Sequence, residues 1–211
     1  MRVTNYLYIY LCKTGHTMRI LAFTDIHGST KALKEVIAKS KAADLLIGCG
    51  DLTIFSHNLH SILQELNRIG KPVFLIHGNH EGQEDMKKKC EQFKNIRFIH
   101  RQAFLYEGIF FIGYGGGGFS IHDEQFERFA SKQRWPKGAR TVLVTHGPPY
   151  GTRQDALMRG HCGNKSYRHF ITERSINLVI CGHIHENNNT RTILGRTLII
   201  NPGPEGTVIR F

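Results

Sequence analysis

Short apolar runs recur along the chain, and each ends within two residues of an Asp or a His. Five such runs stand at 20–24, 45–49, 73–76, 142–145 and 178–181. Continuous runs of this length, bounded by Gly or polar residues, are typical of strands that are buried on both faces of a sheet. We therefore expect these five segments to form interior, largely parallel strands.

Helical periodicity lies between several of these runs. The segment 59–66 places Leu or Ile at positions i, i+3, i+4 and i+7, and 33–37 begins a similar pattern. Such spacing puts the apolar side chains on one helical face. Shorter helices are expected over 124–135 and 165–174. The alternation of strand and helix in the first half predicts helices that cover the sheets.

Strand-rich stretches without intervening helices also occur, at 96–99, 109–113, 192–200 and 207–211. An α/β fold with two mixed sheets flanked by helices accommodates both patterns. In open α/β sheets, ligands bind outside the carboxyl ends of the strands. The polar residues that follow the apolar runs are therefore expected to lie together at one edge.

The length and the net charge limit the number of domains and the kinds of partner that fit the sequence. The 211 residues suit one domain with a substantial core. Lys and Arg outnumber Asp and Glu by 28 to 17, which gives a net charge of +11. This charge favours anionic partners, whether phosphate esters, nucleic acid or a membrane surface, without choosing among them. The densest basic run, 87–89, is interpreted as a solvated helix face rather than a nucleic-acid site.

The first 17 residues and the cysteines indicate where the protein is located. Residues 1–17 are expected to be an N-terminal extension or, over 5–11, an extra edge strand. The apolar part of this segment is too short to span a bilayer, so no membrane association is expected. Five scattered cysteines without a C-x-x-C pair predict free thiols and a reducing, cytoplasmic location.

Metal-binding residue types follow the expected strand ends at short spacings. Asp25 and His27 stand two apart, and His183 and His185 repeat this spacing. On an extended chain such a pair faces the same way, so both side chains can reach one ion. Asp51 follows a glycine, and a carboxylate at such a turn can bridge two ions about 3.5–4 Å apart.

Each short motif alone is a weak signal, because D-x-H and H-x-H arise often by chance. Together, the strand ends supply seven candidate ligands of the types that divalent metals prefer at hydrolytic sites. They are Asp25, His27, Asp51, Asn79, His146, His183 and His185. Burying so many polar groups without a metal would leave them poorly satisfied.

The order of these motifs resembles that of the calcineurin-like metallophosphoesterases, and further segments resemble their small single-domain, phosphodiesterase-like branch. The pattern D-x-H, GD, GNH[DE], a single His and GHxH stands here at 25–27, 50–51, 78–81, 146 and 182–185. The resemblance implies that residues 18–211 form a calcineurin-like phosphoesterase domain. Its expected fold is a four-layer α-β-β-α sandwich with the site at the carboxyl ends of the sheets.

The resemblance also divides the seven ligand candidates between two ions. The implied division is Asp25, His27 and His185 on the first ion, Asn79, His146 and His183 on the second, and Asp51 bridging both. His80 would contact the phosphate and protonate the leaving oxygen instead of binding metal. The implied reaction is hydrolysis of phosphodiesters or phosphomonoesters by a metal-bound hydroxide, with phosphodiesters favoured. The ligand set tolerates Mn, Fe, Zn, Co or Ni, and Mn is favoured.

Two further histidines and a glycine-rich segment are candidates for contacts with the substrate. His161, in a segment that resembles the same branch, and His122 are candidates for substrate contacts. The glycine-rich segment 113–118 lacks the Lys and Ser/Thr of a P-loop. A flexible turn is therefore favoured over a phosphate-binding loop. If the segment is functional, its backbone would border the pocket and admit bulky substrates.

Two alternative functions remain open. A nuclease of the same superfamily fits the basic sequence pI of about 9.6, but 211 residues leave little room for the capping domain of double-strand nucleases. A binding scaffold that keeps the fold without chemistry would be expected to lose ligands, and all seven candidates and His80 are present. A nucleotide-like substrate is compatible with the motifs, and they do not specify an oligomeric state.

Overall fold

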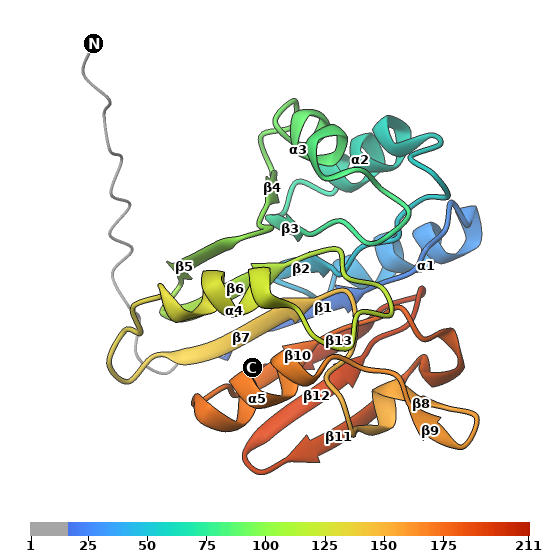
Figure 1. Cartoon of the computed structure of the whole chain (residues 1–211). Coiled ribbons are helices and arrows are strands. Elements are labelled where there is room, and N and C mark those ends of the chain that lie inside the picture. Colours follow the sequence, from blue (N-terminus) through green and yellow to red (C-terminus); the bar gives the residue numbers. More distant parts are fainter. Residues whose placement is uncertain (1–16) are drawn as a thin grey trace.

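Two large β-sheets pack against each other at the centre of the fold, and helices cover their outer faces (Figure 1). The structure is a computed structural model that describes residues 17–211. The edge strand expected over 5–11 and the thiol of Cys12 lie outside the described residues.

The first sheet has the strand order β13-β1-β2-β3-β4. Its strands are β1 (Arg19–Phe23), β2 (Leu45–Gly48), β3 (Val73–Leu75), β4 (Ile96–Phe98) and β13 (Thr207–Arg210). Strands β1 to β4 pair in parallel, and β13 pairs antiparallel with β1. Parallel pairing places the carboxyl ends of β1, β2 and β3 at the same edge of the sheet.

The second sheet has the strand order β11-β12-β10-β7-β6-β5. Its strands are β5 (Gln102–Tyr106), β6 (Ile109–Tyr114), β7 (Arg140–Thr145), β10 (Leu178–Ile180), β11 (Thr190–Leu194) and β12 (Thr197–Asn201). The four inner strands are parallel, and the edge strands β5 and β11 are antiparallel to their neighbours. Both sheets are therefore mixed, as expected.

Helices and short elements complete the architecture. The helices are α1 (Thr30–Ser40), α2 (Leu59–Arg68), α3 (Gln83–Cys90), α4 (Glu124–Ser131) and α5 (Lys165–Glu173). The short elements are the 3₁₀ turns η1 (Arg153–Asp155) and η2 (His185–Asn187) and the hairpin of β8 (Ala156–Leu157) and β9 (Gly160–His161). Figure 1 shows α1 to α3 grouped apart from α4 and α5.

Three apolar clusters confirm the four-layer arrangement. One joins the first sheet to α1, α2 and α3, and includes Leu21, Leu46 and Leu63. A second lies between the two sheets, and a third joins the second sheet to α4 and α5. Alternate residues of β1 serve different clusters, because successive side chains of a strand point to opposite faces. The sequence of layers is helix, sheet, sheet, helix, which agrees with the expected α-β-β-α sandwich.

Several element boundaries differ from the sequence-based expectations. The helix expected over 124–135 ends at Ser131, and the chain reaches Pro136 in an irregular segment. The stretch 192–200 is two strands, because Gly195 adopts a left-handed φ of 60° between them. The basic run 87–89 lies on α3 with largely exposed side chains, so its interpretation as a helix face is confirmed.

Free thiols agree with the expectation where the structure describes them. The four cysteines within residues 17–211 are all free, and Cys49 and Cys181 are buried at strand ends. None of the helices in the described part of the chain is both long and apolar enough to cross a bilayer.

Candidate metal centre

The seven candidate ligands gather where the carboxyl ends of the two sheets meet. Asp25 and His27 follow β1, Asp51 follows β2, and Asn79 follows β3 of the first sheet. His146 follows β7, and both His183 and His185 follow β10 of the second sheet. The turn after each strand therefore presents its ligands toward the other sheet.

The backbone at several ligands is left-handed rather than extended. Residues Asp25, His27, Asp51 and His183 have φ values of 53°, 47°, 52° and 72°. A non-glycine residue in this region costs about 1 kcal/mol or more, and such conformations concentrate at functional sites. The expectation that Asp25 and His27 face the same way on an extended chain is thus wrong. Their side chains converge because the chain turns sharply beyond β1.

Glycines let the turns approach one another. Gly50 has a φ of 94°, and a Cβ atom there would lie 2.4 Å from the backbone nitrogen of Gly78. A Cβ atom on Gly182 would lie 2.5 Å from Oδ2 of Asp25. Any larger residue at either position would push the loops apart, so the glycines in these motifs serve close packing.

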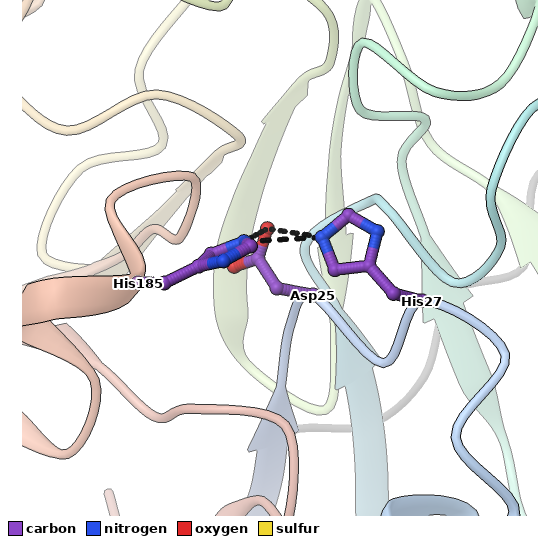
Figure 2. A group of neighbouring side chains, drawn as sticks. All are labelled: Asp25, His27 and His185. Atoms are coloured by element: carbon purple, nitrogen blue, oxygen red, sulfur yellow. Dashed lines mark hydrogen bonds and ion pairs between the residues drawn. The ribbon is translucent and has the colours of Figure 1, made fainter.

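The first cluster consists of Asp25, His27 and His185, whose side chains point toward one another (Figure 2). Oδ1 of Asp25 lies 3.5 Å from Nε2 of His185 and 3.9 Å from Nε2 of His27. The two imidazole Nε2 atoms are 3.0 Å apart. One carboxylate oxygen and two ring nitrogens thus face a common point, as a divalent ion requires.

The second cluster consists of Asp51, His146 and His183, with Asn79 beside it. Nε2 of His146 lies 3.4 Å from Oδ2 of Asp51 and 3.0 Å from Oδ1 of Asn79. Nδ1 of His146 lies 2.8 Å from the carbonyl oxygen of Cys49. If Nδ1 carries the proton and donates it there, Nε2 is free to bind metal, which is the usual arrangement of a metal-ligating histidine.

Asp51 lies between the two clusters. Its Oδ2 atom is 3.4 Å from Nε2 of His146 in the second cluster and 3.9 Å from Nε2 of His27 in the first. Its Oδ1 atom accepts the backbone N–H of His80 at 2.9 Å, which orients the carboxylate. Although His183 and His185 stand only two residues apart, they join different clusters.

His80 lies at the edge of this arrangement. Its Nε2 atom is 4.0 Å from Oδ2 of Asp51, and its ring makes an edge contact with His27 at a centroid distance of 4.9 Å. With those two residues it forms a third group of potential ligand atoms. Its side chain is 27% exposed, so it can reach a substrate in front of the clusters.

Unpaired polar atoms mark the site as suited to cations. Nine side-chain polar atoms of the described residues are buried without a hydrogen-bond partner, and three of them lie at the site: Oδ1 of Asp25, Nε2 of His183 and Nδ1 of His80. Buried polar atoms are almost always satisfied, so such orphans need an explanation. Two of the three belong to candidate ligands, and divalent ions would satisfy both of them.

The protonation states of Asp51 and His183 suit metal binding, whereas the neighbouring carboxylates raise the pKa of His146 and His185, so a metal would displace a proton there. Burial raises the pKa of Asp51, but the hydrogen bond and charge of His146 outweigh it and lower the pKa to about 2. Burial and the nearby His146 lower the pKa of His183 to about 4. At neutral pH the carboxylate is therefore ionised and the imidazole is neutral, which are the forms that bind metal.

His161 is held by a buried carboxylate. Its Nδ1 atom lies 2.8 Å from Oδ1 of Asp155, while its side chain remains 42% exposed. Asp155 also accepts the backbone N–H groups of Gly151, Thr152 and Gly163 at 2.8–3.0 Å. The dyad therefore fixes the loop that follows His146 and leaves one face of the His161 ring in solvent.

His122 lies in a different place from the ligands. It is exposed and lines a polar cavity of about 510 Å³, beside the paired rings of His77 and His100. The glycine run separates this cavity from the metal centre: a Cβ atom on Gly118 would lie 3.8 Å from Cε1 of His183. The run thus borders the candidate site, as expected if it has a functional role.

Glu81 follows His80, and from this place the sequence predicts that it orients the His80 ring or caps a helix. It is buried and accepts hydrogen bonds from the backbone N–H groups of Asp51, Thr53 and Gly78 and from the hydroxyl of Thr53. It neither caps α3, which begins after Gly82, nor bonds the ring of His80. The only sequence feature that singles out Glu81 is its position directly after the Gly-Asn-His triplet 78–80.

A comparison with protein families matches the calcineurin-like phosphoesterases over residues 18–187. The chain belongs to this family. The matched region contains all seven candidate ligands and His80. No curated protein matches the sequence.

Solved structures show the same fold at low sequence identity. The chain is similar to TT1561 of Thermus thermophilus, with a TM-score of 0.76 and 15% identity over 90% of this chain and 91% of that one. It is also similar to a dimetal phosphatase from Danio rerio, with a TM-score of 0.59 and 10% identity over 87% and 86% of the two chains. At these identities the likeness confirms the calcineurin-like sandwich fold.

Proposed function

We propose that this phosphoesterase hydrolyses phosphodiesters in preference to phosphomonoesters and that it uses two divalent ions, preferably Mn²⁺. The two-ion part of the proposal is supported by the position of Asp51 between the two clusters, with one carboxylate oxygen facing a histidine of each. A bridging carboxylate is the usual way to hold two ions close together. The diester preference rests on the resemblance to the phosphodiesterase-like branch.

The donor set defines where the ions would bind. Asp25, His27 and His185 would hold the first ion, and Asp51 would bridge to the second. Asn79, His146 and His183 would complete the second site. When bound, such ions lower the pKa of water to give a nucleophile at neutral pH and polarise the phosphoryl oxygens.

The chain itself orients the substrate and moves the proton. His80 stands beside both Asp51 and His27 without a side-chain hydrogen bond to either, and its ring is partly exposed. An imidazole in this position can donate its proton to the leaving oxygen as the P–O bond breaks, which contributes about 10²–10⁴-fold to the rate. The exposed face of His161 is suited to a contact with the substrate's phosphate or its ester group.

A hydrolysis screen tests the proposal. Metal-free protein should release little p-nitrophenol from bis(p-nitrophenyl) phosphate, and added Mn²⁺ should restore release faster than with Mg²⁺ or Zn²⁺. The diester should react with a higher kcat/KM than p-nitrophenyl phosphate. Asp51→Asn, which keeps the side-chain shape but removes the charge, should abolish turnover. A preference for the monoester would overturn the diester assignment, and metal-independent turnover would overturn the mechanism.

Oligonucleotides extend the same screen, because the net charge of +11 favours polyanions. Cleavage of a single-stranded oligonucleotide with a higher kcat/KM than the small diester would identify a nuclease. We expect the small diester to be the better substrate. The described residues form a single sandwich of two large sheets, without the capping domain that double-strand nucleases of the superfamily carry.

A further inference from the structure

Two large aromatic side chains stand exposed beside the metal centre. Phe55, in the loop after β2, is 80% exposed, and Phe119, in the loop after β6, is 62% exposed. Of the eight exposed large hydrophobic side chains in the described chain, four lie in these two loops. Exposed apolar groups that cluster at a polar site mark a recognition surface.

Each ring contacts an imidazole of the site. Phe55 lies against His80 at a centroid distance of 5.1 Å, and Phe119 makes an edge contact with His183 at 4.5 Å. Both distances fall within the range of aromatic pairs. The two loops come from different sheets, so the contacts attach one ring to each half of the site.

The two rings border the same opening. Nε2 of His80 lies 4.0 Å from Oδ2 of Asp51, and the ligand atom of His183 lies within 4.8 Å of an Asp51 oxygen. Because both imidazoles adjoin Asp51, the phenyl rings that pack on them flank the place where a phosphate would sit. We name Phe55 and Phe119 together the aromatic rim.

Backbone contacts hold the aromatic rim in place without burying it. Phe55 has a left-handed φ of 50°, and the turn around it is closed by the N–H of His57 donating to the carbonyl of Ile54 at 3.0 Å. Beside Phe119, the N–H of Ser120 donates to the carbonyl of Gly117 at 2.9 Å. A non-glycine residue kept in this conformation, and presenting an apolar ring to solvent, points to a role in binding.

We propose that the aromatic rim binds a planar aromatic group, such as a nucleobase or an aryl ring, that is esterified to the phosphate at the metal centre. The inference rests on the proposed phosphoesterase function and specifies its substrate class. A planar ring can stack on a phenyl face while its phosphate reaches the metals, and stacking of this kind typically strengthens binding about tenfold or more per ring. An aliphatic ester would gain much less from the same surfaces.

Phosphonates test the inference because they bind like phosphates without being hydrolysed. Isothermal titration of the Mn²⁺-loaded protein would compare phenylphosphonate with methylphosphonate, and cyclohexylphosphonate would control for apolar area. We expect phenylphosphonate to bind about tenfold more tightly than the other two. Phe55→Ala and Phe119→Ala should each reduce this ratio about three- to tenfold, and Phe119→Tyr should restore it. The affinity for methylphosphonate should stay within about twofold.

Controls separate the possible outcomes. Leu105→Ala removes another exposed apolar side chain, on β5, and should leave the ratio unchanged. Equal affinities for the three phosphonates in the wild type, or an unchanged ratio in both Phe variants, would overturn the aromatic rim while ester hydrolysis persists. An equal loss of affinity for all three phosphonates would show a merely structural role and also overturn it. Absence of ester hydrolysis in every form would instead refute the proposed function.

Discussion

The carboxylate of Glu81 accepts a hydrogen bond from the backbone N–H of Asp51 at 3.0 Å. The same carboxylate accepts the N–H of Gly78 at 3.1 Å and both the N–H and the hydroxyl of Thr53 at 2.8 and 2.9 Å. One buried side chain thus ties the turn after β2 to the turn after β3. Asp51 is held toward both clusters before any ion arrives.

Glu81→Gln should therefore weaken both the fold and the metal site. The amide keeps the size of the side chain but leaves one acceptor oxygen and turns an N–H₂ group toward the donors. We expect the free energy of unfolding to fall by about 2–3 kcal/mol and the affinity for Mn²⁺ to fall about 10- to 100-fold. Urea unfolding and Mn²⁺ titration measure the two effects. Glu84→Gln, at an exposed position on α3, is the control, and wild-type Mn²⁺ affinity in Glu81→Gln would contradict the role.

His80→Ala should separate proton transfer from metal binding. Because His80 is proposed to protonate the leaving oxygen, its loss should lower kcat about 100-fold or more. The Mn²⁺ content should stay unchanged, since His80 is not proposed to bind metal. The loss should be smaller for p-nitrophenyl esters than for alkyl esters, since p-nitrophenolate leaves readily without a proton. Steady-state kinetics on both esters, together with metal analysis, provide the measurement. Equal losses on the two substrates would argue against an acid.

Asp51→Ala and His161→Ala should affect metal binding very differently. Asp51 faces both clusters, whereas His161 is bonded to Asp155 on the loop after β7. We expect Asp51→Ala to lose most bound Mn²⁺ and His161→Ala to keep the full amount while its KM rises severalfold. Metal analysis after gel filtration measures this directly. The reverse order would exclude the ligand assignment given above.

His100 and His77 should make the protein less stable in acid. Burial and neighbouring positive groups lower the pKa of His100 to about 3, and burial above all lowers that of His77 to about 4. The unfolded chain, with a pKa near 6.5, then binds more protons below pH 6.5. Above that pH the two neutral histidines cost the folded protein no stability. Below it, the free energy of unfolding should fall by about 1.4 kcal/mol per histidine for each pH unit toward pH 4.

A single substitution checks this pH dependence. Nδ1 of His100 accepts the N–H of Gly115 at 2.8 Å, and the amide oxygen of Asn can take over that bond. His100→Asn should therefore reduce the slope of unfolding free energy between pH 6.5 and 4.5 in metal-free protein. His57→Asn, at an exposed position, should retain the full slope. An unaltered slope in His100→Asn would show that this histidine does not titrate on unfolding.

Much of the fold could be predicted because its signals are local. The i, i+3, i+4, i+7 pattern at 59–66 marks α2, and continuous apolar runs mark the interior strands. Strand β5 gave no such signal, since its residues are partly exposed and do not alternate cleanly. The hairpin of β8 and β9 is too short for any periodicity to show.

The candidate ligands could also be predicted, because their residue types and spacings recur at strand ends. The sequence could not show that Asp25 and His27 converge through left-handed turns, nor that Glu81 serves the backbone of Asp51 from 30 positions away. The contacts of Phe55 with His80 and of Phe119 with His183 likewise depend on packing between distant loops. Such relationships follow from the tertiary fold and leave no local pattern.

Asp51 is assigned to bridge two ions, and electron paramagnetic resonance of Mn²⁺ can detect such a bridge. Metal-free protein would be titrated with Mn²⁺ and its spectrum recorded at each step. Two ions held about 3.5–4 Å apart by a shared carboxylate should give a spin-coupled spectrum that is complete at two equivalents per chain and is lost in Asp51→Ala. Binding that saturates at one equivalent, or a spectrum of uncoupled ions only, would show that Asp51 does not bridge two ions.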